Sequence, residues 1–189
     1  MSNDLHERLR ARLGTHLLSP SPDLAEVARA LGAEIRACGT AVAALRARLG
    51  HRQARWRLYG RDRFGATAEL HGLPGGAWTE LHDHGTLWGV DVVVAGALEV
   101  ESWTLGPNGP LAGSNRRTWL GPGDALWFER EDAYAHRCRN LSATQPALTL
   151  NVLGGELEQV RHFLPSARSW VTSHRQPPPL EPLPAGFAA

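Results

Sequence analysis

The feature that most constrains the fold is a series of short β-type runs that begins at Gln53. They alternate with turn signals, of which Gly106-Pro107-Asn108-Gly109-Pro110 and Gly121-Pro122-Gly123-Asp124 are the clearest. Many short strands joined by regular turns favour an all-β sandwich or small barrel. We expect strands at Arg55–Tyr59, Ala66–His71, Trp78–His84, Trp88–Val94, Leu98–Leu105, Arg117–Leu120, Ala125–Glu129, Ala135–Cys138 and Ala147–Leu153.

The region before the β-type runs has a helical pattern. Apolar residues recur at spacings of three and four through residues 4–50, which is typical of amphipathic helices. Ser21-Pro22 predicts the start of a second helix and Gly39 its end. Thr40 predicts the cap of a third helix over Ala41–Leu49, stopped by Gly50. We expect these helices, residues 1–52, to pack on a barrel formed by residues 53–170.

The C-terminal part of the chain shows a weaker pattern. After Gly154-Gly155 we expect a helical or irregular stretch to Trp170, and the Pro-rich tail from Gln176 predicts an extended arm. The arm is assigned to residues 171–189. The tryptophans in strand-like runs are expected mainly in the barrel core; they are Trp78, Trp88, Trp103, Trp119 and Trp127.

Composition excludes several functions. The chain has 189 residues and a formal net charge of +1, which argues against a nucleic-acid surface or a polybasic membrane surface. The chain contains 20 arginines and no lysine, which excludes lysine Schiff-base chemistry and a P-loop lysine. Cys38 and Cys138 are not a CxxC pair, and the N-terminus lacks a signal peptide, so we expect reduced thiols in a cytoplasmic protein.

The sharpest chemical motif is His82-Asp83-His84. Side chains two residues apart on a strand point to the same face, so the two imidazoles face one side and Asp83 the other. Two neutral imidazoles on one face of a sheet can bind one divalent metal ion. An isolated HxH is a weak signal, and two exposed histidines on an edge strand are the alternative.

The surroundings of this motif resemble those of the cupin superfamily. Gly76 precedes the HxH, Gly96 follows it, and a third histidine, His136, comes later with Asn140 beyond it. That resemblance implies a cupin-type jelly-roll barrel with an N-terminal helical extension. In most cupins a carboxylate follows the HxH, but here Gly89 stands at its position, so the site is expected to contain only histidines.

This departure resembles the thiol dioxygenases of the cysteine dioxygenase family, particularly their bacterial branch, where Trp-Gly follows the HDH as Trp88-Gly89 does here. The resemblance covers roughly residues 55–155. It implies that His82, His84 and His136 hold one Fe(II), with Ni(II) or Co(II) as alternatives. Its implied partners are a small thiol and O2, with no nucleic acid or membrane, and we expect a monomer or small homo-oligomer.

Three histidines suit thiol chemistry for a physical reason. Neutral imidazoles leave the full charge of a divalent ion uncompensated, so an anionic thiolate is favoured as substrate.

The resemblance further implies a substrate-anchoring arginine on an early strand, and Arg57 lies 25 residues before His82. Arg61 and Arg63 are fallback candidates for the bidentate contact with a carboxylate.

The catalytic relay of that family is altered in this chain. Its Ser-x-His-x-Tyr pattern falls on Thr149, Asn151 and Leu153, so the tyrosine hydroxyl is missing. Asn151 can still form hydrogen bonds, and Tyr134 is a candidate to supply the missing hydroxyl.

The function expected first is therefore oxidation of L-cysteine or a mercapto-carboxylic acid to a sulfinic acid. The alternatives are a specialised-metabolism oxygenase that converts cysteine to a different oxidised product, a cupin that binds metal or ligand without turnover, and a purely structural barrel.

Overall fold

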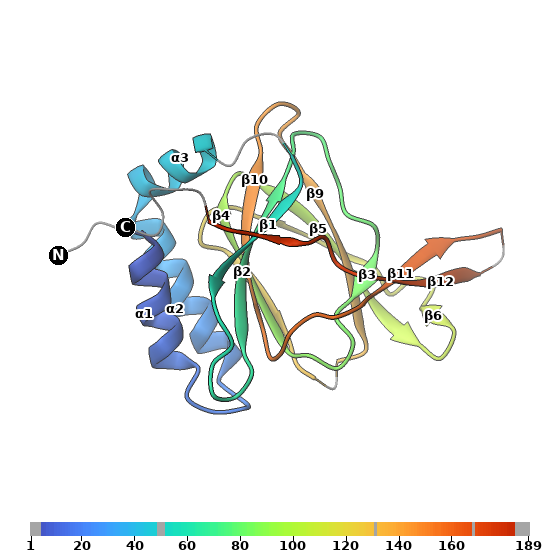
Figure 1. Ribbon diagram of the computed structural model, residues 1–189. Helices are drawn as coiled ribbons and strands as arrows, with labels where there is room; N and C mark the ends of the chain where they lie inside the picture. The colour runs from blue at the N-terminus through green and yellow to red at the C-terminus, as the bar shows by residue number, and fades with distance from the viewer. Residues whose placement is uncertain (1–4, 49–51, 131, 168, 184–189) are drawn as a thin grey trace.

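A computed structural model describes residues 5–48, 52–130, 132–167 and 169–183 (Figure 1). It confirms a jelly-roll barrel with three N-terminal helices on one side. The predicted helix stop at Gly50 and the last residues of the tail lie outside the described residues. The elements are α1 (Leu5–His16), α2 (Leu24–Ala37), α3 (Gly39–Arg48), β1 (Ala54–Tyr59), β2 (Thr67–Leu73), β3 (His82–Asp83), β4 (Gly89–Ala95), β5 (Leu98–Gly106), β6 (Gly109–Pro110), β7 (Arg116–Leu120), β8 (Ala125–Phe128), β9 (Tyr134–Asn140), β10 (Ala147–Leu153), β11 (Val160–Pro165), β12 (Trp170–Arg175) and β13 (Leu180–Glu181).

Two sheets form the walls of the barrel. One has the strand order β13-β1-β2-β10-β4-β8; in the other, β12-β11-β3-β9-β5 are neighbours, and β5 also pairs with β6 and β7. All pairs are antiparallel except β1 with β13. Because side chains alternate across each strand, one set of positions points into the barrel and the other points out. This alternation determines which residues meet in the interior.

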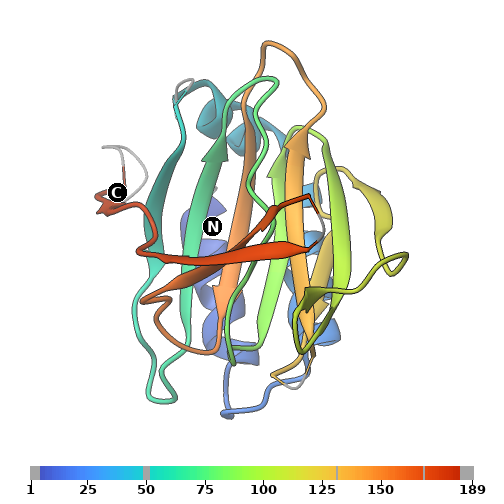
Figure 2. The ribbon, with the colours of Figure 1, turned by 90° about the vertical axis from the view of Figure 1, so that its right-hand side faces the viewer.

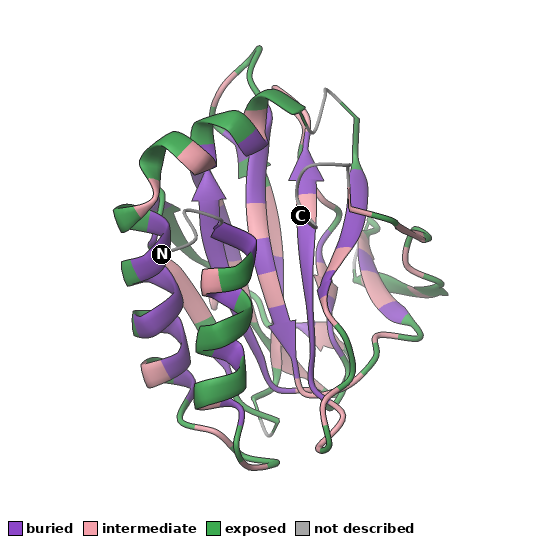
Figure 3. Ribbon diagram, turned by 60° about the vertical axis from the view of Figure 1, so that its left-hand side comes forward, coloured by how far each residue is buried: buried purple, intermediate pink, exposed green. Residues whose placement is uncertain are grey.

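The three helices cover the outer face of the first sheet (Figure 3). Leu31 and Ile35 of α2 are buried in one cluster with Val90 and Val92, the outward-facing residues of β4. The helices are therefore part of the main hydrophobic core. The start of α2 differs from the prediction, because Asp23 caps it and accepts a hydrogen bond from the Glu26 amide. The helix thus begins two residues later than Ser21-Pro22 predicts.

The prediction for the C-terminal part was wrong in one respect. The stretch expected to be helical or irregular contains β11, which pairs with β3 and β12. Figures 1 and 2 show the chain running from β12 back across the barrel to β1, where β13 adds a short parallel strand. The register pairs His162 of β11 with His82, so edge pairing and not a helical period stabilises this segment.

The tryptophans also differ from the prediction. Trp88 is buried and its indole N–H donates to the Pro20 carbonyl, but Trp78, Trp119 and Trp127 are at least half exposed. Strand alternation explains Trp119, which pairs with Glu99 on the outer face of the barrel. Among the helices of the described residues, none has the length and hydrophobicity of a membrane span.

We predict that α2 and the barrel unfold together. Leu31→Ala removes a fully buried side chain and should lower the free energy of unfolding by about 2–5 kcal/mol. Urea denaturation followed by circular dichroism measures the change. Leu18→Ala is the matched control, since that leucine is 59% exposed and should change stability by less than about 0.5 kcal/mol. A separate transition for the helices would contradict the shared core.

Candidate metal centre

The structure brings the three motif histidines together inside the barrel. His82 lies on β3 directly opposite His136 on β9, and His84 follows two residues after His82. The ring centroids are 4.7 Å apart for His82 and His136, 5.1 Å for His84 and His136, and 5.2 Å for His82 and His84. One ligand nitrogen from each ring lies within 4.8 Å of the others. A single ion can bridge three nitrogens at that spacing.

Two of the rings are oriented by neighbouring polar groups. The Nδ1–H of His82 donates to the Glu80 carbonyl oxygen at 2.9 Å, which leaves Nε2 as the free ligand atom. The Nδ1 of His136 lies 3.0 Å from the Tyr134 hydroxyl and 3.7 Å from a carboxylate oxygen of Asp91. Such contacts select the tautomer of a metal-binding histidine and hold its ring in place. Tyr134 therefore contacts a proposed ligand.

Burial keeps the three imidazoles in the form that binds metal. Desolvation lowers the pKa of His82 to about 4 and lowers those of His84 and His136 well below their usual value. Neutral imidazole is the ligand form, so the rings need not lose a proton at neutral pH before binding an ion. The set of three uncharged nitrogen donors fits a divalent transition metal.

Phe128 occupies the side of the cluster where a carboxylate ligand would come from residue 89. A Cβ added to Gly89 would lie 2.2 Å from the Phe128 ring. That ring stacks on Tyr134, with centroids 5.3 Å apart, and lies 5.1 Å from His84. The ring of Phe128 therefore fills the space that a carboxylate side chain at position 89 would occupy.

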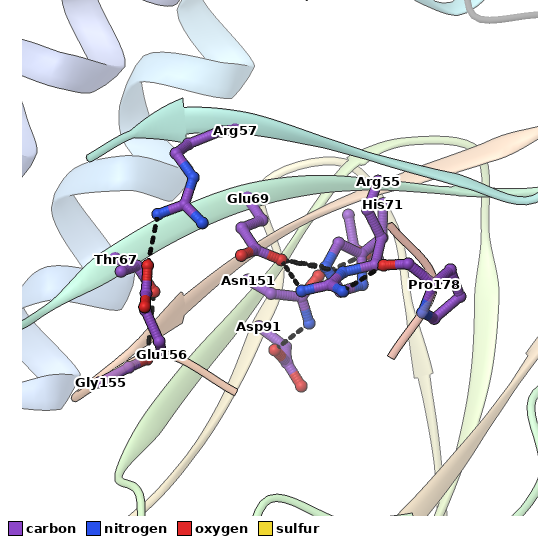
Figure 4. A network of polar contacts seen from close by, with 11 residues as sticks. Arg55, Arg57, Thr67, Glu69, His71, Asp91, Asn151, Gly155, Glu156 and Pro178 are labelled. Carbon is purple, nitrogen blue, oxygen red and sulfur yellow. Dashed lines mark hydrogen bonds and ion pairs between the residues drawn. The ribbon is translucent and has the colours of Figure 1, made fainter. Parts of the chain in front are cut away.

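Asp91 is a functional candidate that the sequence analysis above does not include. It lines the cavity two residues after Gly89 and accepts a hydrogen bond from the Asn151 amide (Figure 4). A carboxylate oxygen of Asp91 also lies 3.7 Å from the Nδ1 atom of His136. Asn151 accepts in turn from the Thr149 hydroxyl at 2.9 Å. Burial raises the pKa of Asp91 to about 7. Strand alternation from Gly89 was the signal that could have identified it.

Hydrogen bonds at the positions of the family's relay therefore extend to Asp91. Leu153, at the position of the missing tyrosine, is buried and pairs with Gly89. The chain of polar contacts runs from Thr149 through Asn151 to Asp91 and approaches His136. The side chain of Asn151 thus supports a carboxylate beside the histidines.

The histidines face a cavity of about 470 Å³. Its lining includes Arg55, which donates to Glu69 and to the Pro178 carbonyl oxygen, with His71 on the same carboxylate (Figure 4). Arg57 is not among the described residues that line the cavity, and it is paired with Glu156 at 3.2 Å. The arginine of β1 that lines the cavity is thus two residues before the one that spacing selected.

The comparisons with known proteins find distant structural similarities only. No family model and no curated protein matches the chain. A cupin 2 domain-containing protein from Halorhodospira halophila is 20% identical, with 61% of this chain and 71% of that chain covered and a TM-score of 0.47. Oxalate decarboxylase from Lactobacillus farciminis is 19% identical over 55% of this chain and 29% of that chain, with a TM-score of 0.43. At these identities, function has to be inferred from this chain's own residues.

We predict that Gly89 and Phe128 are energetically coupled. Gly89→Ala should destabilise the fold because the new methyl group overlaps the Phe128 ring, at a cost of about 1–3 kcal/mol. In a Phe128→Ala background the same change should cost much less, because the space is then free. Urea denaturation of the two single variants and the double variant measures the coupling. If the free-energy changes of the two single variants simply add in the double variant, the Phe128 ring does not occupy the space beside Gly89.

We also predict that the metal-free protein loses stability on acidification. The unfolded chain binds protons at the histidines below about pH 6.5, whereas the folded state does not until the pH is far lower, so stability falls from pH 7 to pH 5. Asp91 acts in the opposite direction, because its raised pKa makes the folded state bind a proton in that window.

Two variants test the opposite effects of the histidines and of Asp91 on stability. The free energy of unfolding is measured by urea denaturation at pH 7 and pH 5 with a chelator present. His82→Asn should make the loss between pH 7 and pH 5 smaller, and Asp91→Asn should make it larger. Equal pH dependence in all three proteins would contradict the assigned burial of both groups.

Proposed function

We propose that this protein is a mononuclear non-heme iron dioxygenase that oxidises the sulfur of a small thiol to a sulfinic acid. The observation that carries the proposal is a cluster of three neutral histidines, His84 and His136 buried and His82 partly buried, that faces a large cavity, with Phe128 where a carboxylate ligand would stand. Because these ligands bring no negative charge, the site favours an anionic ligand such as a thiolate. L-cysteine and mercapto-carboxylic acids are the substrate class.

The reaction balances without an outside reductant. A thiol R–SH and one O2 give R–SO2H, in which both oxygen atoms are bonded to sulfur. Sulfur loses four electrons and O2 gains four. When bound, Fe(II) would lower the pKa of the thiol and supply the redox chemistry needed for O2.

The chain's own residues would hold the site in position and keep water out. Glu80 and Tyr134 fix the orientation of two of the histidines. Gln176 and Pro178, from the segment between β12 and β13, line the cavity. Fixed ligands in a water-poor site need little rearrangement during reaction.

The carboxylate of the substrate is the next element of the proposal. Arg57, the anchor expected from spacing, is turned toward Glu156, so we assign the anionic group of the substrate to the Arg55 side of the cavity. There Arg55, Glu69 and His71 form a network that holds the guanidinium in place. A positioned arginine suits a planar carboxylate.

A second product is favoured by one observation. The interior has a leucine, Leu153, at the relay's hydroxyl position, and the carboxyl group of Asp91 stands beside the histidines instead. A missing fixed donor of this kind typically costs about 10²–10³ in rate. A specialised oxygenase that converts cysteine to a different oxidised product would fit this change.

The test is anaerobic reconstitution with Fe(II), Ni(II) or Co(II), followed by measurement of oxygen uptake and product mass over a panel of small thiols. We expect uptake with Fe(II) and a mass gain equal to two oxygen atoms. A different product mass would select the second candidate, and no uptake with any metal would contradict an oxygenase.

Metal content of two histidine variants tests the ligands themselves. His136→Ala should retain less than about a tenth of the wild-type iron after desalting, because two imidazoles bind far more weakly than three. His174→Ala is the matched control, since this histidine is exposed on β12 outside the cluster. Equal iron in the His136 variant would show that the third ligand is wrongly assigned.

A further inference from the structure

The cavity is much larger than cysteine requires. At about 30 Å³ for each water-sized group, 470 Å³ corresponds to about 15 such groups. Cavities of about 300–1,000 Å³ typically hold ligands of drug size. A substrate no larger than cysteine would leave most of the cavity to water.

One end of the cavity is apolar. Val93 of β4 and Val100 of β5 point into it from opposite walls, and both are buried. The rest of this apolar end comes from the same two sheets; its residues are Leu73, Leu98, Leu120 and Leu126. Water in such a lining finds few hydrogen-bond partners, so an apolar ligand group is favoured there.

The apolar end adjoins the histidines directly. Val100 pairs with Cys138, which lies two residues after His136 on β9 and therefore on the same face. Val93 lies two residues after Asp91 on β4, again on the same face. A ligand bound at the histidines would thus have the apolar end of the cavity directly beside it.

Several side chains on the polar side of the cavity are paired within the protein. Arg55 is paired with Glu69, and Asn151 bonds both Thr149 and Asp91 (Figure 4). These side chains can hold one polar head but offer few free groups to a ligand that is polar throughout. The complement of this cavity is a molecule with one polar head and an apolar body.

We propose that the substrate carries an apolar body of several carbons, which lies against Val93, Val100 and Leu126 while the head lies at the histidines. This inference rests on the proposed function only for the identity of the head as a thiol. Within the proposed class of L-cysteine and mercapto-carboxylic acids, it therefore favours members with a longer apolar body over L-cysteine itself. Branched or long-chain mercapto-carboxylic acids are the favoured class.

A homologous series tests the proposal by binding alone. The probes are 2-mercaptopropionate, 2-mercaptobutanoate and 2-mercaptohexanoate, in which thiol and carboxylate stay fixed while the chain lengthens. Isothermal titration calorimetry of the Fe(II)-loaded protein without oxygen measures the dissociation constants. We expect binding to tighten by about fourfold for each added methylene, the gain typical of a buried CH₂. Equal affinities along the series, or no binding by any member, would overturn the proposal.

The matching 2-hydroxy acids separate this inference from the thiol function. If the hydroxy acids bind as tightly as the thiols and show the same chain-length dependence, the apolar body is supported and the thiol head is wrong. If thiols alone bind, but with no chain-length dependence, the thiol function is supported and the apolar body is wrong.

Variants locate the body within the cavity. Val100→Phe and Leu126→Trp each fill part of the apolar end, and each should weaken binding of 2-mercaptohexanoate by about tenfold while changing that of 2-mercaptopropionate by less than about twofold. Leu126 is only half-buried, so its variant is the safer one for folding. Leu141→Trp, at an exposed site outside the lining, is the control. Unchanged binding in both folded cavity variants would overturn the placement.

Discussion

The close approach of three largely desolvated imidazoles on the inner wall of the barrel is the interaction on which the rest of the structure depends. The pairing of β3 with β9 places His82 against His136, and the two-residue repeat of the strand adds His84. Desolvation then keeps the rings uncharged, which lets them lie within contact of one another and bind a cation. Rings that carried charge at neutral pH would repel both one another and the metal.

The surroundings of the histidines follow from that arrangement. Gly89 leaves room for the Phe128 ring, which packs against His84 and Tyr134 and closes the side from which a fourth protein ligand would come. Asp91, held by Asn151, has a carboxylate oxygen 3.7 Å from His136 of the cluster. The protein thereby keeps this carboxyl group, whose pKa burial raises to about 7, at the edge of the site and leaves the cavity side for an anionic ligand.

Local pattern predicts the parts of this site that depend on strand alternation. The shared facing of His82 and His84 follows from the order of residues along one strand, whereas the third histidine and the missing carboxylate at Gly89 are what the resemblance to cupin motifs implies. Contacts between strands distant in sequence could not be read in this way. Arg55 lines the cavity because Glu69 and the Pro178 carbonyl hold its side chain there, whereas Arg57 pairs with Glu156. The strand β11 forms because it pairs with β3, which is distant in sequence. The exposure of Trp119 and Trp127 likewise depends on which face each strand turns to the interior.

The most direct measurement of the central claim is X-ray absorption spectroscopy of the Fe(II)-loaded protein, before and after a thiol is added without oxygen. This account predicts that three imidazoles per iron dominate the multiple-scattering signal, and that a sulfur neighbour appears on addition of the thiol while the imidazole count stays at three. An iron with one or two imidazoles and carboxylate oxygens in their place, or one that gains no sulfur neighbour, would contradict a three-histidine centre built for a thiolate.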